Sequence, residues 1–361
     1  MTTLLRLDHC GLYCEAGGFH IDPWRPVPRA LITHAHGDHA RGGSAAYLAA
    51  GAGLPLLRAR LPEDAAIEGI GYGERRRVGG VEVSFHPAGH VLGSAQIRIA
   101  AARETVVVSG DYKLAPDPTC APFEPVACDT FVTESTFGLP IYRWEPPGQT
   151  FAAILRWWQD NRDQGRASVL FAYALGKAQR ILAGLAPWVD GWPGPIRVHG
   201  AIDRINRAYE AAGVALPPVA KVADAPAGTD WSQSLILAPP SARGSRWLQR
   251  FEPLSMAFAS GWMALRGPRR RANLDRGFTL SDHADWPALN AAIAAAGPAE
   301  VWVTHGYRAE LVRWLAERGQ AARAVETRFE GEAGAAPADE AEGAAPAGGD
   351  HREPIDPGHP A

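Results

Sequence analysis

Long apolar runs and paired cysteines are both missing from this chain of 361 residues. No apolar run is long enough to span a bilayer, so we expect no contact with a membrane. The first residues, MTTLLRLDHCGLYCEAGG, lack a basic stretch followed by an apolar one, so no secretory signal peptide is expected. The four cysteines form no CxxC pair, which favours reduced thiols in or near the core over a thiolate metal site. These absences favour a cytoplasmic protein.

The charge of the chain is unevenly distributed. The formal net charge is −3, yet residues 332–361 hold seven acidic residues and one arginine, so the preceding residues carry a small positive charge. A mildly basic body is compatible with an anionic partner. The last stretch, 331–361, is rich in Ala, Gly, Pro and acidic residues, and we predict that it is a disordered tail.

Short β-rich runs dominate the first 135 residues, and each ends at polar side chains. RALIT leads into THAHGDH, VEVSF leads into HPAGH, ETVVVSG leads into Asp111, and TFVTES ends at Glu134 and Ser135. Such an arrangement places reactive side chains on loops at one edge of a rigid sheet. From about Gly138, strands alternate with helical patterns such as TFAAILRWWQDNRDQG, which predicts a small α/β unit with parallel strands.

Seven residues at these run ends are candidate metal ligands, and imidazole and carboxylate suit Zn²⁺, Mn²⁺ or Fe²⁺. They exceed the needs of one tetrahedral ion and match two ions roughly 3.5–4 Å apart, bridged by a carboxylate and a hydroxide. A lone histidine near a strand end is more often an ordinary hydrogen-bonded residue, but four candidate ligands within HAHGDH argue against that alternative. The candidates are His34, His36, Asp38, His39, His90, Asp111 and His305.

THAHGDH, HPAGHVLGSA, SGDYKL and VWVTHGY, in this order, resemble the metallo-β-lactamase superfamily. The resemblance implies an αβ/βα sandwich with two metals at one edge, zinc first and manganese as an alternative. It assigns one metal to His34, His36 and His90, the other to Asp38, His39 and His305, and the bridging position to Asp111. Asp22 in IDPWRP matches a carboxylate that supports the ligands from behind. A simple turn residue before Pro23 is an equally good interpretation of Asp22.

VTESTFG, FAYALGKAQRIL, SGWM and TLSDHADW further resemble the β-CASP nucleases, in which a small α/β cap domain is inserted into the sandwich. The domain boundaries that follow are 1–138 and 263–330 for the sandwich, 139–262 for the cap, and 331–361 for the tail. Phosphodiester hydrolysis would use a metal-bridging hydroxide as nucleophile, with Asp38 among the catalytic residues. His283 would be the acid for the leaving oxygen, and Glu134 would hold its other nitrogen. Singly, Glu134 and His283 could instead cap local turns.

Candidate contacts to nucleic acid form a separate group. Lys177 at a helix start, and Ser260 with Gly261 after a strand, could bind phosphate through backbone N–H groups. The arginines of RGPRRR lie beside Trp262, a combination that suits single strands. Charge runs are usually solvated faces, which is the alternative for all of these. The arginines singled out are Arg266, Arg269 and Arg270.

The motifs favour one branch of the nucleases without excluding another. A histidine at position 305 is typical of RNA-processing β-CASP enzymes, whereas the short cap and IDPWRPVPRALITHAHGDHARGG resemble bacterial ligase-associated exonucleases. We therefore predict a DNA exonuclease in DNA repair, a partner of an ATP-dependent DNA ligase and a helicase, with an RNA-processing ribonuclease as the alternative. A thioester or lactone hydrolase would need neither a cap nor an acid at position 283. A non-cutting scaffold would lack metal ligands, and all seven are present.

Overall fold

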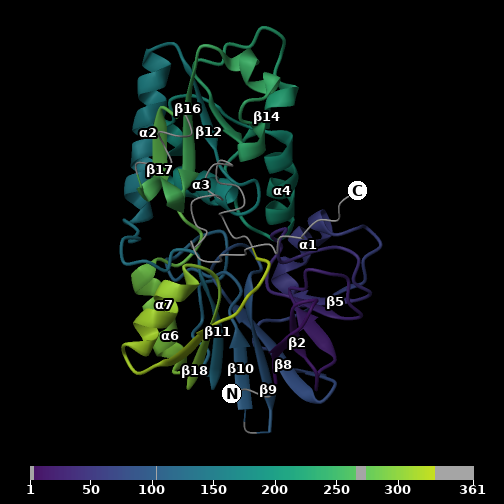
Figure 1. Ribbon diagram of the computed structural model, residues 1–361. Coiled ribbons are helices and arrows are strands. Elements are labelled where there is room, and N and C mark those ends of the chain that lie inside the picture. Colours follow the sequence, from purple (N-terminus) through teal and green to yellow (C-terminus); the bar gives the residue numbers. More distant parts are fainter. Residues whose placement is uncertain (1–3, 103, 266–273, 330–361) are drawn as a thin grey trace, which may run out of the picture.

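The computed structural model describes residues 4–102, 104–265 and 274–329. Within them, two sheets form the lower body of the molecule (Figure 1). The first sheet has the order β1 (Arg6–Leu7), β2 (Leu12–Cys14), β3 (Phe19–Ile21), β4 (Ala30–Ile32), β5 (Tyr47–Ala50) and β6 (Ile67–Ile70). The second has the order β19 (Ala321–Ala324), β18 (Glu300–Gly306), β11 (Thr130–Ser135), β10 (Glu104–Val108), β9 (Ala95–Ala101), β8 (Val81–Pro87) and β7 (Arg76–Val78).

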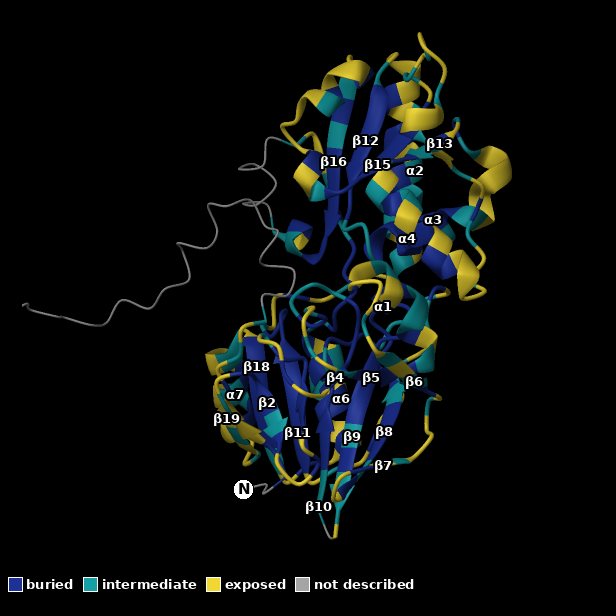
Figure 2. Cartoon of the chain, turned by 90° about the vertical axis from the view of Figure 1, so that its right-hand side faces the viewer, coloured by how far each residue is buried: buried dark blue, intermediate teal, exposed yellow. Residues whose placement is uncertain are grey.

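The two sheets bury their apolar faces against each other. Phe19 and Leu31 of the first sheet share one core with Phe85, Ile97 and Val106 of the second. Three helices cover the outer faces: α1 (Leu54–Arg60) packs on the first sheet, while α6 (Trp286–Ala296) and α7 (Arg308–Ala316) pack on the second. The body is therefore a helix–sheet–sheet–helix sandwich, as expected, and Figure 2 shows its strands buried and the outer sides of these helices exposed.

A third sheet lies above the body, and all of its strands are parallel (Figure 1). Its order is β14 (Ala220–Lys221), β13 (Ile196–Val198), β15 (Leu235–Ala238), β12 (Ala167–Phe171), β16 (Leu254–Ser260) and β17 (Arg276–Thr279). The core under it takes apolar side chains from α2 (Pro147–Asp163), α3 (Lys177–Leu185) and α4 (Gly200–Ala211). The alternating pattern thus predicted a parallel α/β unit correctly. We call residues 147–279, which carry this sheet and its helices, the inserted unit.

The inserted unit continues further along the chain than its expected boundary at residue 262. Strand β17 pairs with β16 from Ala257–Arg276 to Ser260–Thr279, so residues 276–279 belong to the third sheet and not to the C-terminal part of the sandwich. Short 3-10 helices complete the described elements: Gly51–Gly53, Ala186–Gly191, Val222–Asp224, Pro240–Ala242, Arg246–Phe251 and Gly261–Ala264. Among the described helices, none combines the length and apolarity needed to cross a bilayer.

The strand directions explain where the functional loops gather. Strands β10, β11 and β18 are parallel neighbours, and β8 runs in the same direction because β9 is antiparallel to both β8 and β10. Their carboxyl ends therefore lie at one edge of the sheet, facing the inserted unit (Figure 1). The loop after β4 of the first sheet opens at the same edge. Side chains that are distant in the sequence meet there.

Candidate metal centre and active site

Asp111 lies at the centre of the predicted ligand set. Its Oδ2 atom is 3.5 Å from His34 Nε2, 3.7 Å from His39 Nε2 and 3.8 Å from His90 Nε2. Its Oδ1 atom is 3.1 Å from Nε2 of His305, which lies in β18 one residue before its end. The two remaining candidates join through their neighbours: Asp38 Oδ2 lies 3.6 Å from His39 Nε2, and His36 Nδ1 lies 3.0 Å from His90 Nε2. All seven candidates therefore form one cluster, in which the ligand atoms of His34, His36, His90 and Asp111 lie within 4.8 Å of one another.

Gly110 allows Asp111 to reach this position. Its φ angle is +58°, a conformation in which side chains with a Cβ are strained. A Cβ here would stand 2.7 Å from the Cβ of Thr33, the residue before His34. The loop after β10 and the loop after β4 can therefore approach closely only because residue 110 is glycine.

His36 and His90 present two lone pairs to each other. Nδ1 of His90 lies 2.8 Å from the carbonyl oxygen of Asp282, and Nε2 of His36 lies 3.2 Å from that of Leu175. A carbonyl oxygen only accepts, so each of these nitrogens carries the proton. Burial lowers the pKa of both imidazoles, most strongly that of His90, so both rings are neutral. The facing atoms, His90 Nε2 and His36 Nδ1, then lack a proton between them and need a cation.

Four further atoms of the cluster are buried without a hydrogen-bond partner in the described part of the chain: His34 Nε2, His39 Nε2, His305 Nε2 and Asp111 Oδ1. A buried polar atom left unsatisfied costs about 1–3 kcal/mol, so a concentration of them in one place calls for an explanation. Each lies within 3.7 Å of an atom of Asp111 or is itself an Asp111 atom. Divalent ions among these atoms would satisfy all four, and the donor set of imidazoles and carboxylates fits Zn²⁺ or Mn²⁺.

Asp22 supports the cluster from behind. Its carboxylate accepts from the backbone N–H of Thr33 at 2.8 Å and from the Thr33 hydroxyl at 2.5 Å, and it lies 2.7 Å from His39 Nδ1. Its φ angle is +43°, a strained conformation for a non-glycine residue that is common at functional sites. Burial alone would lower the pKa of His39, but Asp38, Asp111 and Asp22 together raise it to about 10.

His283 and Glu134 form a pair beside the cluster. Nδ1 of His283 lies 2.8 Å from Oε2 of Glu134 and 4.0 Å from Oδ2 of Asp111. Glu134 also accepts from the backbone N–H of Tyr112 at 2.8 Å and from the Thr136 hydroxyl at 2.5 Å, so its carboxylate is held rigidly. The cap of α6 is Asp285 and not His283. Glu134 therefore fixes the orientation of the His283 ring through Nδ1.

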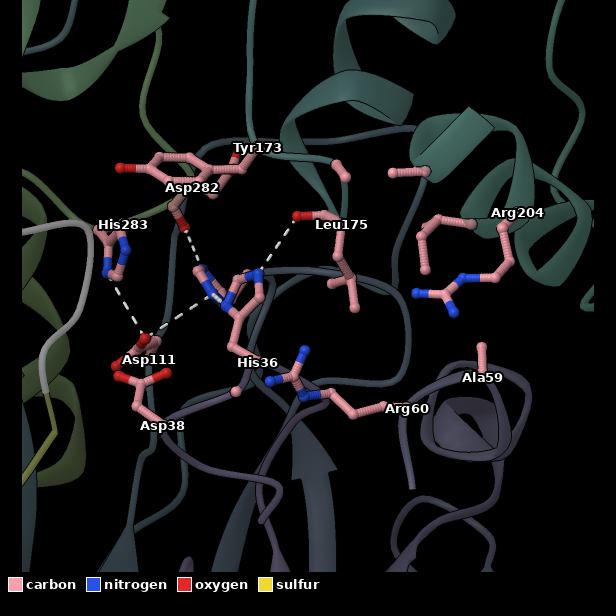
Figure 3. Close-up of a pocket in the computed structure, with 15 residues that line it drawn as sticks. His36, Asp38, Ala59, Arg60, Asp111, Tyr173, Leu175, Arg204, Asp282 and His283 are labelled. Atoms are coloured by element: carbon pink, nitrogen blue, oxygen red, sulfur yellow. Dashed lines mark hydrogen bonds and ion pairs between the residues drawn. The ribbon is translucent and has the colours of Figure 1, made fainter. Parts of the chain in front are cut away.

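A cavity of about 310 Å³ lies between the cluster and the inserted unit. His36, Asp38, Asp111 and His283 line it on the side of the metal-ligand cluster. Figure 3 shows Tyr173, Leu175 and Arg204 of the inserted unit on its other side. The cavity is therefore the place where a substrate would meet both the ligands and the candidate acid.

Lys177, a predicted phosphate contact, is fully buried and belongs to what we call the buried ion cluster: Lys113, Asp117, Lys177, Arg180 and Asp282. Its Nζ atom lies 3.2 Å from Asp282 Oδ2, while Arg180 lies 3.1 Å from Asp282 Oδ1. Burial alone would raise the pKa of Asp282, but Lys177 and Arg180 hold it well below its usual value. The side chain of Lys177 therefore joins α3 to the body and does not belong to the residues that line the cavity. The phosphate contact through its backbone N–H stays a prediction.

The other predicted phosphate contacts are also enclosed or undescribed. Ser260 is buried and its hydroxyl accepts from the backbone N–H of Trp262 at 3.3 Å, while a Cβ on Gly261 would collide with the ring of Phe137. Arg266, Arg269 and Arg270, and the tail at 331–361, lie outside the described residues. Sequence reasoning missed Arg60 and Arg204, which line the cavity, because neither belongs to a motif or a charge run.

No family model matches the chain. It is 30% identical over 317 residues to a protein named "Probable DNA ligase" from Opitutus terrae, an alignment covering 87% of this chain and 30% of that protein. It is 32% identical over 120 residues to "Endoribonuclease ysh1" of Aspergillus fumigatus, covering 32% of this chain and 13% of that protein. It is 29% identical over 195 residues to "Ribonuclease TTHA0252" of Thermus thermophilus, covering 45% and 44% of the two chains.

The chain thus spans less than half the length of each of these relatives. Among solved structures, a protein of unknown function from Enterococcus faecalis V583 aligns with a TM-score of 0.53 at 13% identity, covering 84% of this chain and 80% of that one. That likeness concerns the fold alone. The names of the sequence relatives include both ribonucleases and a DNA ligase.

Proposed function

We propose that the chain is a nuclease of the β-CASP metallo-β-lactamase type, and that it acts as a DNA exonuclease in DNA repair. The observation that carries the proposal is His283, which lines the same cavity as Asp111 and is held by Glu134 at 2.8 Å. Phosphodiester cleavage needs an acid beside the leaving oxygen as well as metal ligands. The names of relatives such as ysh1 and TTHA0252 support a nuclease.

Two divalent ions, zinc first and manganese as an alternative, would occupy the cluster. His34, His36 and His90 would hold one ion, Asp38, His39 and His305 would hold the other, and Asp111 would be shared. When bound, such ions supply an activated water and neutralise charge on a phosphodiester. The chain itself fixes the ligands: Asp22 on His39, the Asp282 carbonyl on His90 and the Leu175 carbonyl on His36 hold the imidazoles with their lone pairs toward the cluster.

His283 would give a proton to the leaving oxygen. Glu134 accepts a hydrogen bond from Nδ1, so we assign the donor toward the cavity to Nε2. The three interactions that hold the Glu134 carboxylate keep the imidazole in one orientation while the proton moves. Such a positioned acid typically accelerates cleavage by about 10²–10⁴-fold.

DNA is favoured over RNA because the alignment with the protein named a DNA ligase is the one that runs along 87% of the chain. It also supports functional association with a DNA ligase. From the motif resemblance we extend this to an ATP-dependent ligase and a helicase. RNA is the second candidate. The ribonuclease names of several relatives and the presence of His305 both favour it.

The deciding experiment uses four linear single strands of one sequence, DNA and RNA, each labelled at the 5′ or the 3′ end, with Zn²⁺ or Mn²⁺ added. Closed circular DNA and RNA strands serve as controls without ends. We expect stepwise shortening of linear DNA from one end, with the circle intact and RNA spared. The Asp111→Ala variant, purified in parallel, identifies any contaminating nuclease.

Other outcomes have definite meanings. Preferred cleavage of RNA would replace the DNA assignment by the ribonuclease alternative, and cleavage of the circles would show endonuclease action. Absence of any cleavage, together with hydrolysis of a chromogenic thioester or lactone, would overturn the nuclease proposal in favour of a small-molecule hydrolase.

A further inference from the structure

Two arginines from different parts of the fold line the cavity beside the metal ligands. Arg60 is the last residue of α1 in the body, and Arg204 lies on α4 of the inserted unit. Figure 3 shows both guanidinium groups extending into the cavity on the side of His36, Arg60 from below and Arg204 from above. Neither residue belongs to a motif that the proposed cleavage uses.

The position of Arg60 is defined by the ligand loop. Its guanidinium lies over Gly37, between two metal-ligand candidates in the sequence, and a Cβ at residue 37 would collide with it. Glycine at this point therefore lets a cation rest directly against the loop that carries His36 and Asp38. Burial and the charge of Arg204 lower the pKa of the Arg60 guanidinium, and the charge of Asp38 opposes this shift. The charges of the two guanidinium groups therefore interact.

Neither cation is neutralised by a partner of its own. Within the described residues, no carboxylate lies within 4.0 Å of Arg60 or Arg204, and no hydrogen bond of either guanidinium is present. The neighbouring arginines on the same helices differ: Arg58 donates to the Ala65 carbonyl at 2.8 Å, and Arg207 lies 3.0 Å from Asp203. Two like charges with no carboxylate within 4.0 Å among the described residues favour an anion between them.

The pair is also held in place. Leu56 and Leu57 of α1 share a buried core with Ile205, Ala208 and Tyr209 of α4, which fixes the two helices against each other. The helices that carry the two arginines are therefore fixed against each other beside the ligand loop. A bidentate donor on each side of a cavity matches the oxygens of a phosphate, which arginine binds with two parallel hydrogen bonds.

We propose that Arg60 and Arg204 form a phosphate subsite for a nucleic-acid strand, next to the position of the scissile phosphate. The inference rests on the proposed nuclease function and names a substrate contact for it. The phosphate is either an internal diester of the strand or a terminal monophosphate, and the two share the same chemistry. In both cases the subsite sets which bond of the strand lies over the metal ligands.

The test measures binding separately from cleavage. Arg60→Gln, Arg204→Gln and the double variant are made in a His283→Ala background, with metal bound, so that the strand survives. Arg58→Gln and Arg207→Gln are the matched controls, one on each helix. Fluorescence anisotropy reports the Kd of single strands of DNA and RNA carrying a 5′-phosphate, a 3′-phosphate or neither, at several salt concentrations.

We expect the double variant to raise Kd by about 10- to 100-fold, the effect of losing one or two charged hydrogen bonds. The slope of log Kd against log salt should fall by about 0.7, the value for one phosphate on a single strand. The controls should change Kd by less than about threefold. A loss seen only with one phosphorylated end assigns a terminal monophosphate, and a loss with every strand assigns an internal diester.

An equal loss of strand affinity in Arg58→Gln and Arg207→Gln would overturn the proposed subsite, because a general positive potential would then explain binding. So would an unchanged Kd in the double variant while the parent protein binds tightly. A parent that binds strands through these arginines but cleaves none, once His283 is restored, would leave the subsite standing and remove only the nuclease function. A parent that binds no strand would overturn both.

Discussion

The metal-ligand cluster and the buried ion cluster lie side by side, and they satisfy their buried polar atoms in opposite ways. In the ion cluster, each of Lys113, Lys177 and Arg180 lies within 3.4 Å of a carboxylate. In the metal-ligand cluster, Nε2 of His34, His39 and His305 has no hydrogen-bond partner among the described residues and faces Asp111. His36 Nδ1 and His90 Nε2 face each other. His90 joins the two, because its Nδ1 atom bonds the carbonyl oxygen of Asp282.

The difference separates two uses of buried charge. A cluster that balances itself ties elements together, here α3 of the inserted unit to the loops of the body. In a cluster whose imidazole lone pairs face each other, bound metal ions would supply the positive charge that the side chains lack. Mutations in the first should therefore affect stability, and mutations in the second should affect metal content.

The largest effect is expected for Asp111→Ala. Removing the shared carboxylate should release most of the bound metal and reduce nuclease activity by about 10³-fold or more, because each metal supplies several kcal/mol of charge stabilisation. Metal content by atomic emission and the rate of strand cleavage check this. A variant that retains two equivalents of zinc would show that Asp111 does not bridge the site.

His283→Ala should lower the cleavage rate by about 10²–10⁴-fold while leaving metal content unchanged, because the proposal makes this ring a proton donor and not a metal ligand. A matched control is His86→Ala. His86 also pairs with a carboxylate, Glu124 at 3.1 Å, but lies away from the cavity. Loss of metal in His283→Ala would instead make this histidine a ligand or a structural residue.

The Asp282→Asn variant tests the buried ion cluster. It leaves Lys177 and Arg180 buried without their shared charge, and breaking such a pair costs about 3–5 kcal/mol of unfolding free energy. Chemical denaturation measures the loss, and Asp203→Asn, which breaks an exposed pair with Arg207, should cost less than about 1 kcal/mol. Equal costs in the two variants would contradict a stabilising role for the buried cluster.

The loss of unfolding free energy caused by Asp282→Asn should depend on pH. The folded pKa of Asp282 is depressed, so its contribution is complete above its unfolded pKa near 3.9 and is lost as pH falls below it. The stability gap between the wild type and Asp282→Asn should therefore narrow by up to about 1.4 kcal/mol per pH unit below pH 4. A gap that stays constant from pH 5 to pH 3 would be inconsistent with an ionised Asp282.

The smallest effect is expected for Asp22→Asn. Loss of its charge weakens the hold on His39 and should reduce metal affinity by about 10- to 100-fold, measured by competition with a chelating dye. Glu124→Gln is the control, because Glu124 lies 3.1 Å from His86 in a similar pair outside the seven-residue cluster. Equal metal affinity in Asp22→Asn and the wild type would support the alternative of a simple turn residue.

Local pattern predicted the elements and the ligand set. Alternating runs with parallel-sheet composition correctly indicated β4, β8, β10 and β11 and the parallel inserted unit. The density of HAHGDH indicated a ligand loop because packed cores do not accommodate so many imidazoles. Each of these signals depends on residues close together in the chain, or on the rule that parallel strands end at one edge.

The sequence by itself determined which residue types stand at the strand ends, and therefore the chemistry that the edge can perform. Only the tertiary structure decided which lysine and arginine side chains pair with buried carboxylates. Folding places Asp282 against the side chain of Lys177, whereas the meeting of α1 and α4 brings Arg60 and Arg204 to one cavity without such a partner among the described residues. The physical reason is that charge balance is a property of spatial neighbours, and these neighbours lie far apart along the chain.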